Sequence, residues 1–371
     1  MEEINEKETS TNQELTCNTC AAILKYKPGT TSLVCEYCGA NNEIITESDA
    51  PIEEIDFEDF IANKLQDEEK IDIVTVKCTS CGASSTLKPN LTSDQCPFCG
   101  VSIVVTNGST SSILKPKSLL PFKIEQKVAA ESFRTWISKL WFAPSNLKKY
   151  VTGTDTLVGM YIPYWTYDSN TDSNYTGERG THYYVTETYE KTENGKTVTE
   201  TRQVQKTSWA SVSGNVDVNF DDVLIIASNS LPVKYTEKLE PWDLENLVPF
   251  NDMYLSGFKT ESYQVDIKTG FDNAKVKIDS KIKEVVISDI GGDEQRVHSV
   301  NTSYNDITFK HILLPLWISA YRYNDKAYRF LVNARTGEVQ GERPYSWIKI
   351  TLFILMIIAI IAGIVYFAKY R

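Results

Sequence analysis

The last 272 residues of this 371-residue chain contain no cysteine, because all eight cysteines lie between Cys17 and Cys99. A secreted disulfide scaffold distributes its cysteines over the fold, whereas this clustering favours metal binding by reduced thiolates. The N-terminus also lacks the basic segment and following apolar stretch of a secretory signal. Both absences predict that the N-terminal region lies in a reducing, cytoplasmic compartment.

Catalytic motifs are equally scarce. Gly195-Lys196-Thr197 ends like a Walker A motif, but Glu190 stands where the first glycine of that motif is required. Asp221 and Asp222 are adjacent, so on a strand we expect them to point to opposite faces and not to share a substrate. We therefore predict no catalytic and no cofactor-binding residues, and no enzyme. An unrecognised site in residues 119–343 is the alternative.

Basic charge is missing where a nucleic-acid-binding region would need it. The net charge is −11, and residues 1–105 contain 19 Asp and Glu against 7 Lys and Arg. Contacts of Lys and Arg with phosphates supply most of the non-specific affinity of proteins for nucleic acids. The acidic N-terminal region therefore argues against nucleic acid as a partner.

The chain does contain a duplicated cysteine motif. Residues 15–40 match residues 76–101 at a constant offset of 61, which indicates a repeated module. Each copy has two Cys-x2-Cys pairs separated by fourteen residues, a pattern that places four thiolates around one tetrahedral Zn²⁺. The predicted ligands of two structural zinc ions are Cys17, Cys20, Cys35 and Cys38, and Cys78, Cys81, Cys96 and Cys99.

Glycines support the zinc assignment. Gly39, Gly82 and Gly100 directly follow a ligand pair, where a positive φ angle turns backbone N–H groups toward the sulfurs. Ala21 takes this place in the first pair, so we expect slight strain there. A thioredoxin-like redox pair would not need four such motifs, and iron is the other metal that four sulfurs can hold.

Charge and hydrophobicity predict a modular α+β protein. We expect a disordered tail (1–14), zinc ribbon 1 (15–42), an acidic linker with a short helix (43–75), zinc ribbon 2 (76–105), a linker (106–118), an α+β domain with an antiparallel sheet (119–343) and a transmembrane helix (347–368). In the acidic linker, Phe57, Phe60, Ile61 and Leu65 recur at helical spacing. This short helix packs on a ribbon or, alternatively, docks a partner.

Periodicity predicts the elements of the α+β domain. They are a helix from Ile124 to Trp141, an exposed hairpin over 172–212 with a turn at Asn194-Gly195, strands over 216–227, a helix over 261–286 and strands over 307–341. Tyr161–Trp165 also resembles Leu313–Trp317, because each segment contains Pro-x-Trp. This echo raises the alternative that the domain consists of two related halves.

The chain ends in its longest apolar run. Ile350 to Ala368 contains no charged residue and spans about 28 Å as a helix, close to the hydrocarbon thickness of a bilayer. Ala359 and Gly363 form a small-xxx-small pair, which leaves a homo-oligomer open. We expect a single-pass anchor in the cell membrane, inserted late in synthesis, with the N-terminal domains in the cytoplasm. The flanking charges do not decide this orientation.

Several segments resemble a family of bacterial zinc-ribbon membrane proteins of the YdjG type, often labelled TFIIB-type zinc ribbon proteins or primosomal PriA-like helicases. The most specific are LLPLWISAYRY at 313–323 and FLVNARTGEVQGERP at 330–344, with support from 209–217 and 220–224. The resemblance covers residues 17–371. It implies an adaptor that works beside phage-shock-type and SPFH-like proteins in envelope stress, and it carries over no catalytic residues.

The sequence therefore predicts an adaptor that displays zinc ribbons and an α+β domain on the cytosolic face of a membrane and recruits protein partners. The alternative is a membrane-tethered nucleic-acid-binding protein without ATPase activity. The feature that discriminates between the two is the acidic charge of residues 1–105.

Overall fold

The computed structural model describes most of the chain. The described residues are 15–44, 52, 54–64, 70–87, 93–104, 109–145, 147, 157–193, 196–324 and 326–370. The expected disordered tail (1–14), Leu65 and the expected Asn194-Gly195 turn lie outside these residues.

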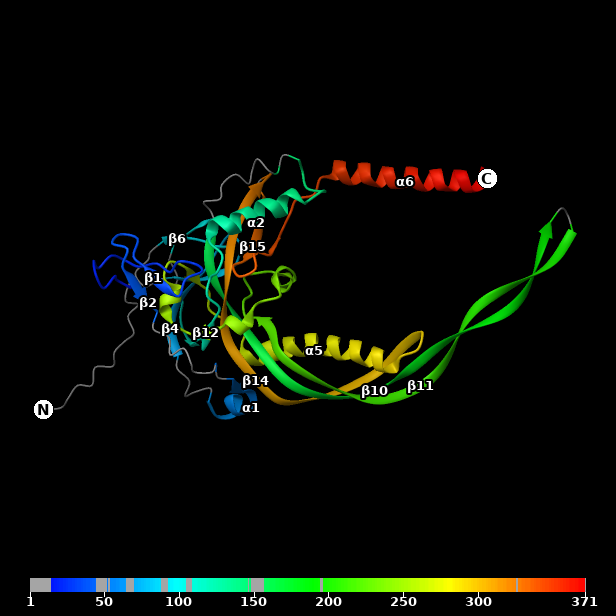
Figure 1. Cartoon of the computed structure of the whole chain (residues 1–371), viewed down its shortest axis with the longest axis horizontal. Coiled ribbons are helices and arrows are strands. Elements are labelled where there is room, and N and C mark those ends of the chain that lie inside the picture. The colour runs from blue at the N-terminus through cyan, green and yellow to red at the C-terminus, as the bar shows by residue number, and fades with distance from the viewer. Residues whose placement is uncertain are drawn as a thin grey trace.

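A long, mostly antiparallel sheet forms the body of the protein (Figure 1), and its main path runs in the order β11-β10-β14-β15-β16. Its strands are β10 Val158–Glu193, β11 Lys196–Ile226, β14 Glu294–Tyr323, β15 Lys326–Asn333 and β16 Val339–Gly341, joined at the edges by β3 Ile55–Asp56, β9 Ser118–Leu119, β12 Val248–Pro249 and β13 Lys259–Thr260. The fold is therefore α+β, as predicted, and it consists mostly of sheet.

Three small sheets belong to the N-terminal region. Their strands are β1 Ser32–Val34, β2 Asn41–Glu43, β4 Lys70–Lys77, β5 Ser84–Leu87, β6 Ser93–Gln95, β7 Ser102–Val104 and β8 Ser109–Leu114. Within the described residues, the helices are α1 Phe57–Asp59, η1 Phe60–Lys64, α2 Gln126–Ser138, α4 Val233–Thr236, η3 Glu237–Leu239, η4 Leu244–Asn246, η5 Asp252–Leu255, α5 Ile267–Ile290 and α6 Trp347–Tyr370.

Different helices and cysteine-containing ribbons pack on the two faces of the large sheet. Helices α2 and α5 pack at different points along the face that carries Tyr161 and Trp165, together with the first ribbon. The opposite face, which carries Met160, Ile162 and Tyr164, is covered by the second ribbon and by α4 and η3. Because successive side chains of a strand point to opposite faces, these inner segments are apolar at nearly every position.

Strands β10 and β11 form the expected hairpin, but it is much longer than 172–212. The two strands pair from Tyr164↔Ile226 out to Glu193↔Lys196. The separate strands expected over 216–227 are instead the inner end of β11. Side chains change from buried to exposed along the hairpin while the backbone ladder continues, so a change in composition did not mark a strand end here.

Two bulges bend these strands at one level. The register of β10 shifts against β11 between Tyr167 and Ser169, and against β14 between Asp168 and Asn170. Asp222 on β11 and Asp306 on β14 have φ angles of 52° and 51°. A left-handed conformation at a bulge sharpens the local bend of a strand, and Asp tolerates it better than most residues.

The helix expected over 261–286 is α5, displaced toward the C-terminus. The carboxylate of Asp266 caps it by accepting two backbone N–H groups of the first turn at 3.0 Å each. It ends at Gly291, whose φ angle is 63°. Strand β14 then begins at Glu294, well before the strand start expected at 307, because it pairs with the long inner part of β10.

The linker expected over 106–118 contains paired strands. Ser109–Leu114 is β8, which pairs with β4 in a three-stranded sheet. Ser118–Leu119 is β9, which pairs with β14 of the large sheet. Apolar residues are few in this segment, so hydrophobic periodicity did not reveal the backbone pairing.

The short helix of the acidic segment packs on the body and not on a ribbon. The ring of Phe57 lies 4.9 Å from that of Phe271, and the ring of Phe60 lies 5.0 Å from that of Phe309. Both phenylalanines are buried. Their burial explains the helical spacing without a partner protein.

The two Pro-x-Trp segments are neighbours in the large sheet. Pro163 is paired with Leu313, and Pro315 with Tyr161, so the segments cross symmetrically. The indole N–H of Trp165 donates to the carbonyl of Val265 at 2.9 Å, just before α5. The indole N–H of Trp317 donates to the carbonyl of Ile124 at 2.8 Å, just before α2. Each tryptophan therefore fixes the segment that immediately precedes one helix.

Candidate metal centres and binding surfaces

The same backbone turn occurs at all four cysteine pairs. In each, the N–H of the residue after the pair donates to the first cysteine's carbonyl, and the first cysteine's N–H donates to the carbonyl one residue further on. In the first pair these bonds are Ala21 N to Cys17 O and Cys17 N to Ala22 O, both 2.8 Å. Such a knuckle aims two sulfurs at one point.

Opposing knuckles bring four sulfurs together in each ribbon. Sγ–Sγ distances are 3.6 Å for Cys17–Cys38 and Cys20–Cys35, and 3.7 Å for Cys78–Cys99 and Cys81–Cys96. All four sulfurs of a group lie within 4.8 Å of one another. A tetrahedron with metal–sulfur bonds of about 2.3 Å has edges of about 3.8 Å. Both groups therefore match one tetrahedral metal ion each and are too wide for disulfides.

Positive φ angles occur where the sequence predicts them. Gly39, Gly82 and Gly100 have φ angles of 72°, 76° and 72°, and Ala21 has 58°. A side chain in this region costs about 1 kcal/mol or more. The first knuckle of the first ribbon thus carries a strain that the other three avoid.

Backbone N–H groups point at the sulfurs. The N–H of Thr19 lies 3.4 Å from Cys17 Sγ and lowers the pKa of the Cys17 thiol to about 6. Knuckle N–H groups likewise lower the pKa of Cys35. Among the first cysteines of the four pairs, Cys96 differs, because burial raises its pKa. The pKa values of the second cysteines Cys20, Cys38 and Cys81 are raised as well. Donors that stabilise thiolates suit a metal site, since thiolates and not thiols bind the metal.

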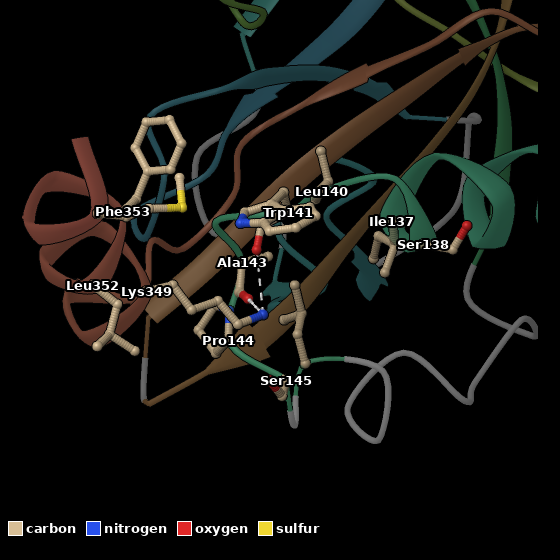
Figure 2. A pocket seen from close by; sticks show the side chains of 12 residues that line it. Ile137, Ser138, Leu140, Trp141, Ala143, Pro144, Ser145, Lys349, Leu352 and Phe353 are labelled. Atoms are coloured by element: carbon tan, nitrogen blue, oxygen red, sulfur yellow. Dashed lines mark hydrogen bonds between the residues drawn. The ribbon is translucent and has the colours of Figure 1, made fainter. Parts of the chain in front are cut away.

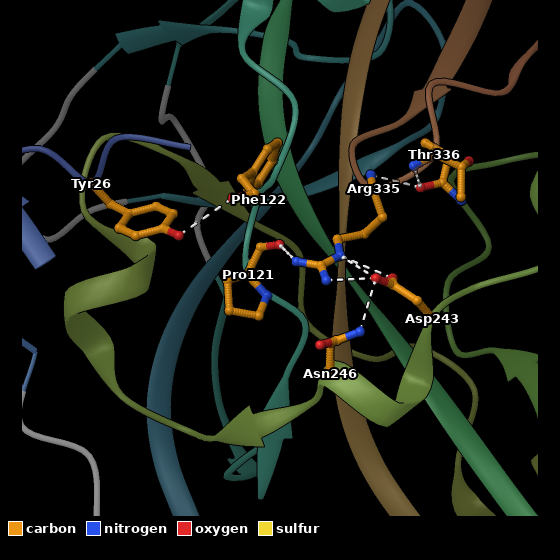
Figure 3. Close-up of polar contacts among 8 residues, drawn as sticks. Tyr26, Pro121, Phe122, Asp243, Asn246, Arg335 and Thr336 are labelled. Atoms are coloured by element: carbon orange, nitrogen blue, oxygen red, sulfur yellow. Dashed lines mark hydrogen bonds and ion pairs between the residues drawn. The ribbon is translucent and has the colours of Figure 1, made fainter. Parts of the chain in front are cut away.

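The first ribbon is attached to the body through Tyr26. Its backbone N–H donates to the carbonyl of Ser256 at 3.0 Å, and its ring lies 5.1 Å from that of Tyr254. Its hydroxyl is shared between the carbonyls of Thr30 at 2.7 Å and Phe122 at 3.3 Å (Figure 3). Ser256 Oγ also donates to the carbonyl of Leu24 at 2.6 Å. The outer side of this ribbon stays in solvent, since Cys20 and Cys38 are exposed.

The second ribbon is embedded more deeply. Phe98, between its last two ligands, is fully buried in the same cluster as Met160 and Leu314 of the large sheet. Lys259 Nζ lies 2.7 Å from the Asp94 carboxylate. Neither Cys81 nor Cys99 is fully exposed.

A buried carboxyl group supports the second ribbon. Ser84 N–H, in β5, donates to Ser230 Oγ at 3.2 Å, and Ser230 Oγ donates to Glu261. Glu261 is 1% exposed and also accepts from Gln264 at 2.6 Å. Burial raises the pKa of Glu261 to about 7. The Glu261 carboxyl group that ends this series of hydrogen bonds therefore gains or loses its proton near neutral pH.

Arg335 lies in segment 330–344, one of the two segments that carry the family resemblance most specifically, and it has a structural role. Its guanidinium Nε donates to Asp243 Oδ1 at 2.9 Å, and its Nη1 donates to the carbonyl of Pro121 at 3.0 Å (Figure 3). Asn333 holds the preceding turn by accepting the Arg335 N–H at 2.8 Å. These bonds tie three distant segments together beside the first ribbon.

Beyond Gly180, strand β10 loses its second neighbour. Strand β14 pairs with β10 only as far as Gly180↔Glu294, whereas β10 and β11 continue for thirteen more pairs up to Glu193↔Lys196. We call residues 181–208 the arm. At about 3.3 Å per residue it is about 40 Å long, and it extends far beyond the body (Figure 1). None of its side chains that the structure describes is buried.

The two faces of the arm differ in charge. One face carries ion pairs of Glu187 with Lys206 at 3.0 Å and of Lys191 with Glu200 at 3.7 Å, and Tyr189 donates to Glu200 at 2.7 Å. The opposite face has one carboxylate, that of Glu190, and consists of His182, Tyr184, Thr186, Thr188, Glu190, Thr192, Thr197, Thr199, Thr201, Gln203, Gln205 and Thr207. The second face therefore offers hydroxyl and amide groups with little charge.

Three carboxylates meet at the bulge between β10 and β11, well before the start of the arm. Oxygens of Asp168, Asp221 and Asp222 lie within 4.8 Å of one another. The expectation that Asp221 and Asp222 point apart is wrong, because the bulge breaks the alternation of β11 there. Buried Lys310 lies 2.8 Å from Asp222 and 3.1 Å from Glu54. Lys310 thus offsets part of the negative charge of the cluster and fastens the segment of Glu54 to the sheet.

Among the described residues, α6 is the one helix long and apolar enough to cross a membrane, and its span Trp347–Lys369 has a mean hydropathy of 2.9. Lys349 Nζ donates to the carbonyls of Ala143 at 2.7 Å and Trp141 at 3.2 Å (Figure 2). A cavity of about 610 Å³ lies between this loop and the first turns of α6. Helix α6 therefore starts against the end of α2.

Comparisons with known proteins identify a distant relative. The chain is 27% identical over 237 residues to the uncharacterized protein YdjG of Bacillus subtilis strain 168. The match covers 64% of this chain and 66% of that protein, just under two thirds of its length. No family model matches the chain. No solved structure matches it either.

Proposed function

We propose that this protein is a membrane-anchored adaptor whose arm binds other proteins. In this proposal two structural zinc ions hold the ribbons, and α6 holds the body on the cytosolic face of the cell membrane. The observation that carries the proposal is the arm, which extends two strands about 40 Å from the body with both outer backbone edges unpaired among the described residues. An isolated two-stranded ribbon is only marginally stable in water, so a third strand is its natural complement.

Zinc is proposed for both cysteine groups because four thiolates at tetrahedral spacing suit it. The ions would use all four positions for protein ligands, which leaves none for a substrate. Their contribution is to folding, because small ribbons gain much of their stability from the metal. Elemental analysis of the purified full chain should give two zinc ions, and iron in their place would contradict the assignment.

The position of the arm restricts how α6 can be oriented in a membrane. Figure 1 shows α6 and the arm leaving the body on the same side. The charged side chains of the arm cannot enter hydrocarbon. When α6 crosses a bilayer, the connection 342–346, which contains no helix or strand, must therefore redirect it away from the arm. The bonds of Lys349 to the loop at 141–143 are then exchanged for contacts with lipid headgroups.

Proximity labelling in cells tests the adaptor. Three chains are compared: the full protein, a chain lacking residues 346–371, and a chain in which residues 187–202 are replaced by Asn-Gly. We expect both shortened chains to lose a common set of membrane neighbours while retaining two metal ions. An unchanged set in the chain with the short arm would contradict the role of the arm. Protease added outside intact cells should leave residues 1–345 uncut, and cleavage there would reverse the orientation.

Protein partners of the phage-shock or SPFH-like type, and a role in envelope stress, are suggested by the family resemblance alone. The membrane-tethered nucleic-acid binder remains the second candidate. Submicromolar DNA binding by the full chain at physiological salt would favour it. The lack of catalysis is likewise a prediction, and ATP hydrolysis that persists through purification would contradict it.

We also propose that the α+β domain consists of two related halves. The support is the reciprocal contact of Trp165 and Trp317 with the lead-ins of α5 and α2. Strands β13 and β9 add to it, since they pair in parallel with Met160–Tyr161 and with Ile312–Leu313. These positions correspond under the offset that aligns the Pro-x-Trp segments.

A further inference from the structure

One backbone edge of strand β10 is paired with β14 along its inner part and is unpaired along its outer part. From Val158 to Gly180 this edge is paired with β14, and the Asp293 carboxylate accepts the His182 N–H at 2.7 Å. From Tyr183 to Glu193 no strand of the described chain pairs with it. The unpaired backbone N–H and C=O groups of this edge can therefore form hydrogen bonds with a strand of another molecule. A strand added there would run antiparallel, as β14 does.

The charges along this edge are self-complementary. When two copies of β10 pair antiparallel about a two-fold axis at Tyr189, Glu187 of each copy lies opposite Lys191 of the other. Thr186 then lies opposite Thr192, and Tyr189 lies opposite itself. Moving the axis by one residue toward the tip places Glu187 opposite Glu193, and moving it two residues back places Glu187 opposite itself. Opposite charges across a strand pair stabilise it, and like charges weaken it.

The charge of the arm also permits self-association. Residues 181–208 contain four Glu and four Lys or Arg, so the arm is neutral in a chain whose net charge is −11. Two arms can therefore approach without the repulsion that the acidic N-terminal regions would create. In this register the two bodies lie at opposite ends of the joined arms, about 60 Å apart at 3.3 Å per residue. They do not collide.

Resting on the proposed role of the arm as the protein-binding element, we propose that the β10 edge of the arm pairs with the same edge of a second copy of this chain. The joined arms form a four-stranded ribbon in the order β11-β10-β10-β11 with Tyr189 at its centre. The β11 edges and the threonine-rich face remain free for other partners.

A charge-swap experiment tests this register in full-length protein reconstituted in nanodiscs. Glu187→Lys alone and Lys191→Glu alone each place like charges opposite one another in both cross-strand pairs. We expect each variant to dimerise at least about tenfold more weakly than the natural chain, measured by single-molecule photobleaching. Mixing the two variants restores both pairs, so heterodimers should form. Failure of the mixture to dimerise would overturn the register, even if each variant alone is monomeric.

A photo-crosslinking amino acid identifies the edge. At position 189 it should link two copies, and the linked peptides should contain residues 187–191 of the partner copy. At position 203, near the centre of β11 in the arm, it should give no such link. Links from 203 and not from 189 would assign the contact to the β11 edge and overturn the proposal.

Two further chains separate the arm from the other route to a dimer. The chain with residues 187–202 replaced by Asn-Gly should be monomeric, whereas Gly363→Leu, which blocks close packing of α6, should stay dimeric. A dimer that survives loss of the arm overturns this inference. The adaptor function fails separately, when the chain with the short arm keeps all its membrane neighbours.

Discussion

Tyr37 and Phe98 occupy the same position of the duplicated motif, between the last two cysteines of each ribbon, yet their surroundings are opposite. Tyr37 is 82% exposed, whereas Phe98 is fully buried against the large sheet. The knuckles themselves have the same hydrogen bonds and nearly the same sulfur distances. Duplication therefore preserved the metal geometry while docking changed what each ribbon presents to solvent. The second ribbon is part of the body, and the first keeps one side free.

Loss of a metal ligand should give the largest effect and should differ between the ribbons. Cys35→Ser and Cys96→Ser each remove one ligand of a separate group, so each should leave one zinc ion per chain. Metal binding supplies about 10 kcal/mol or more to a small ribbon. Because the second ribbon is packed into the body, we expect Cys96→Ser to lower the melting temperature of the whole chain further. Zinc content and calorimetry are the measurements, and equal melting temperatures would contradict the comparison.

The paired aromatic positions allow a matched test of docking. Phe98→Ala should destabilise the chain by about 3–5 kcal/mol, because it empties a buried site. Tyr37→Ala should change stability by less than about 0.5 kcal/mol, because its ring is in solvent. Urea unfolding of the two variants measures both. A large loss from Tyr37→Ala would mean that the first ribbon is docked as deeply as the second.

Glu261, which is hydrogen-bonded to the second ribbon through Ser230, should make the stability of the chain depend on pH. Burial raises its folded pKa to about 7 from 4.5, so the folded state favours the protonated form. Its contribution to stability is complete below pH 4.5 and is lost as pH rises to about 7, by up to about 3 kcal/mol. Glu261→Gln should remove this loss and make the chain more stable at pH 8.

The control for this prediction is Asp94→Asn, which changes a carboxylate of the second ribbon that is paired with Lys259 at the surface. It should leave the loss of stability between pH 5.5 and 8 in place. An identical pH profile for Glu261→Gln and the natural chain would contradict the link between this carboxyl group and the fold.

The smallest predicted effect concerns the φ angle after the first knuckle. Ala21→Gly should stabilise the first ribbon by about 1 kcal/mol, because glycine adopts a positive φ without a Cβ penalty. Gly82→Ala at the equivalent position of the second ribbon should destabilise by a similar amount, and no atom lies within 4 Å of an added Cβ there. Slower zinc release to a chelator in the Ala21→Gly chain checks the first change. Opposite signs in the two ribbons are the expected result.

Features that are local in the chain could be predicted from the amino-acid sequence. The eight cysteines at their spacing specify four knuckles, since each knuckle closes within six residues. The apolar run of α6, the capped helix α5 and the existence of a hairpin were predicted for the same reason, because their hydrogen bonds join residues close in sequence or follow a strict period. The positive φ angle at Ala21 was also anticipated from the repeat alone.

Features that depend on residues far apart in the chain became visible with the three-dimensional fold. Residues 106–118 contain strands because β4 and β14 lie beside them, and the carboxylates of Asp221 and Asp222 meet because a bulge opposite Asp168 breaks the alternation. The arm is free because β14 ends its pairing at Gly180, a limit that no local pattern in β10 reveals. Likewise, Tyr37 and Phe98 differ through docking and not through their own motif. Backbone pairing and burial join residues far apart in the chain, and a local pattern does not encode which partner arrives.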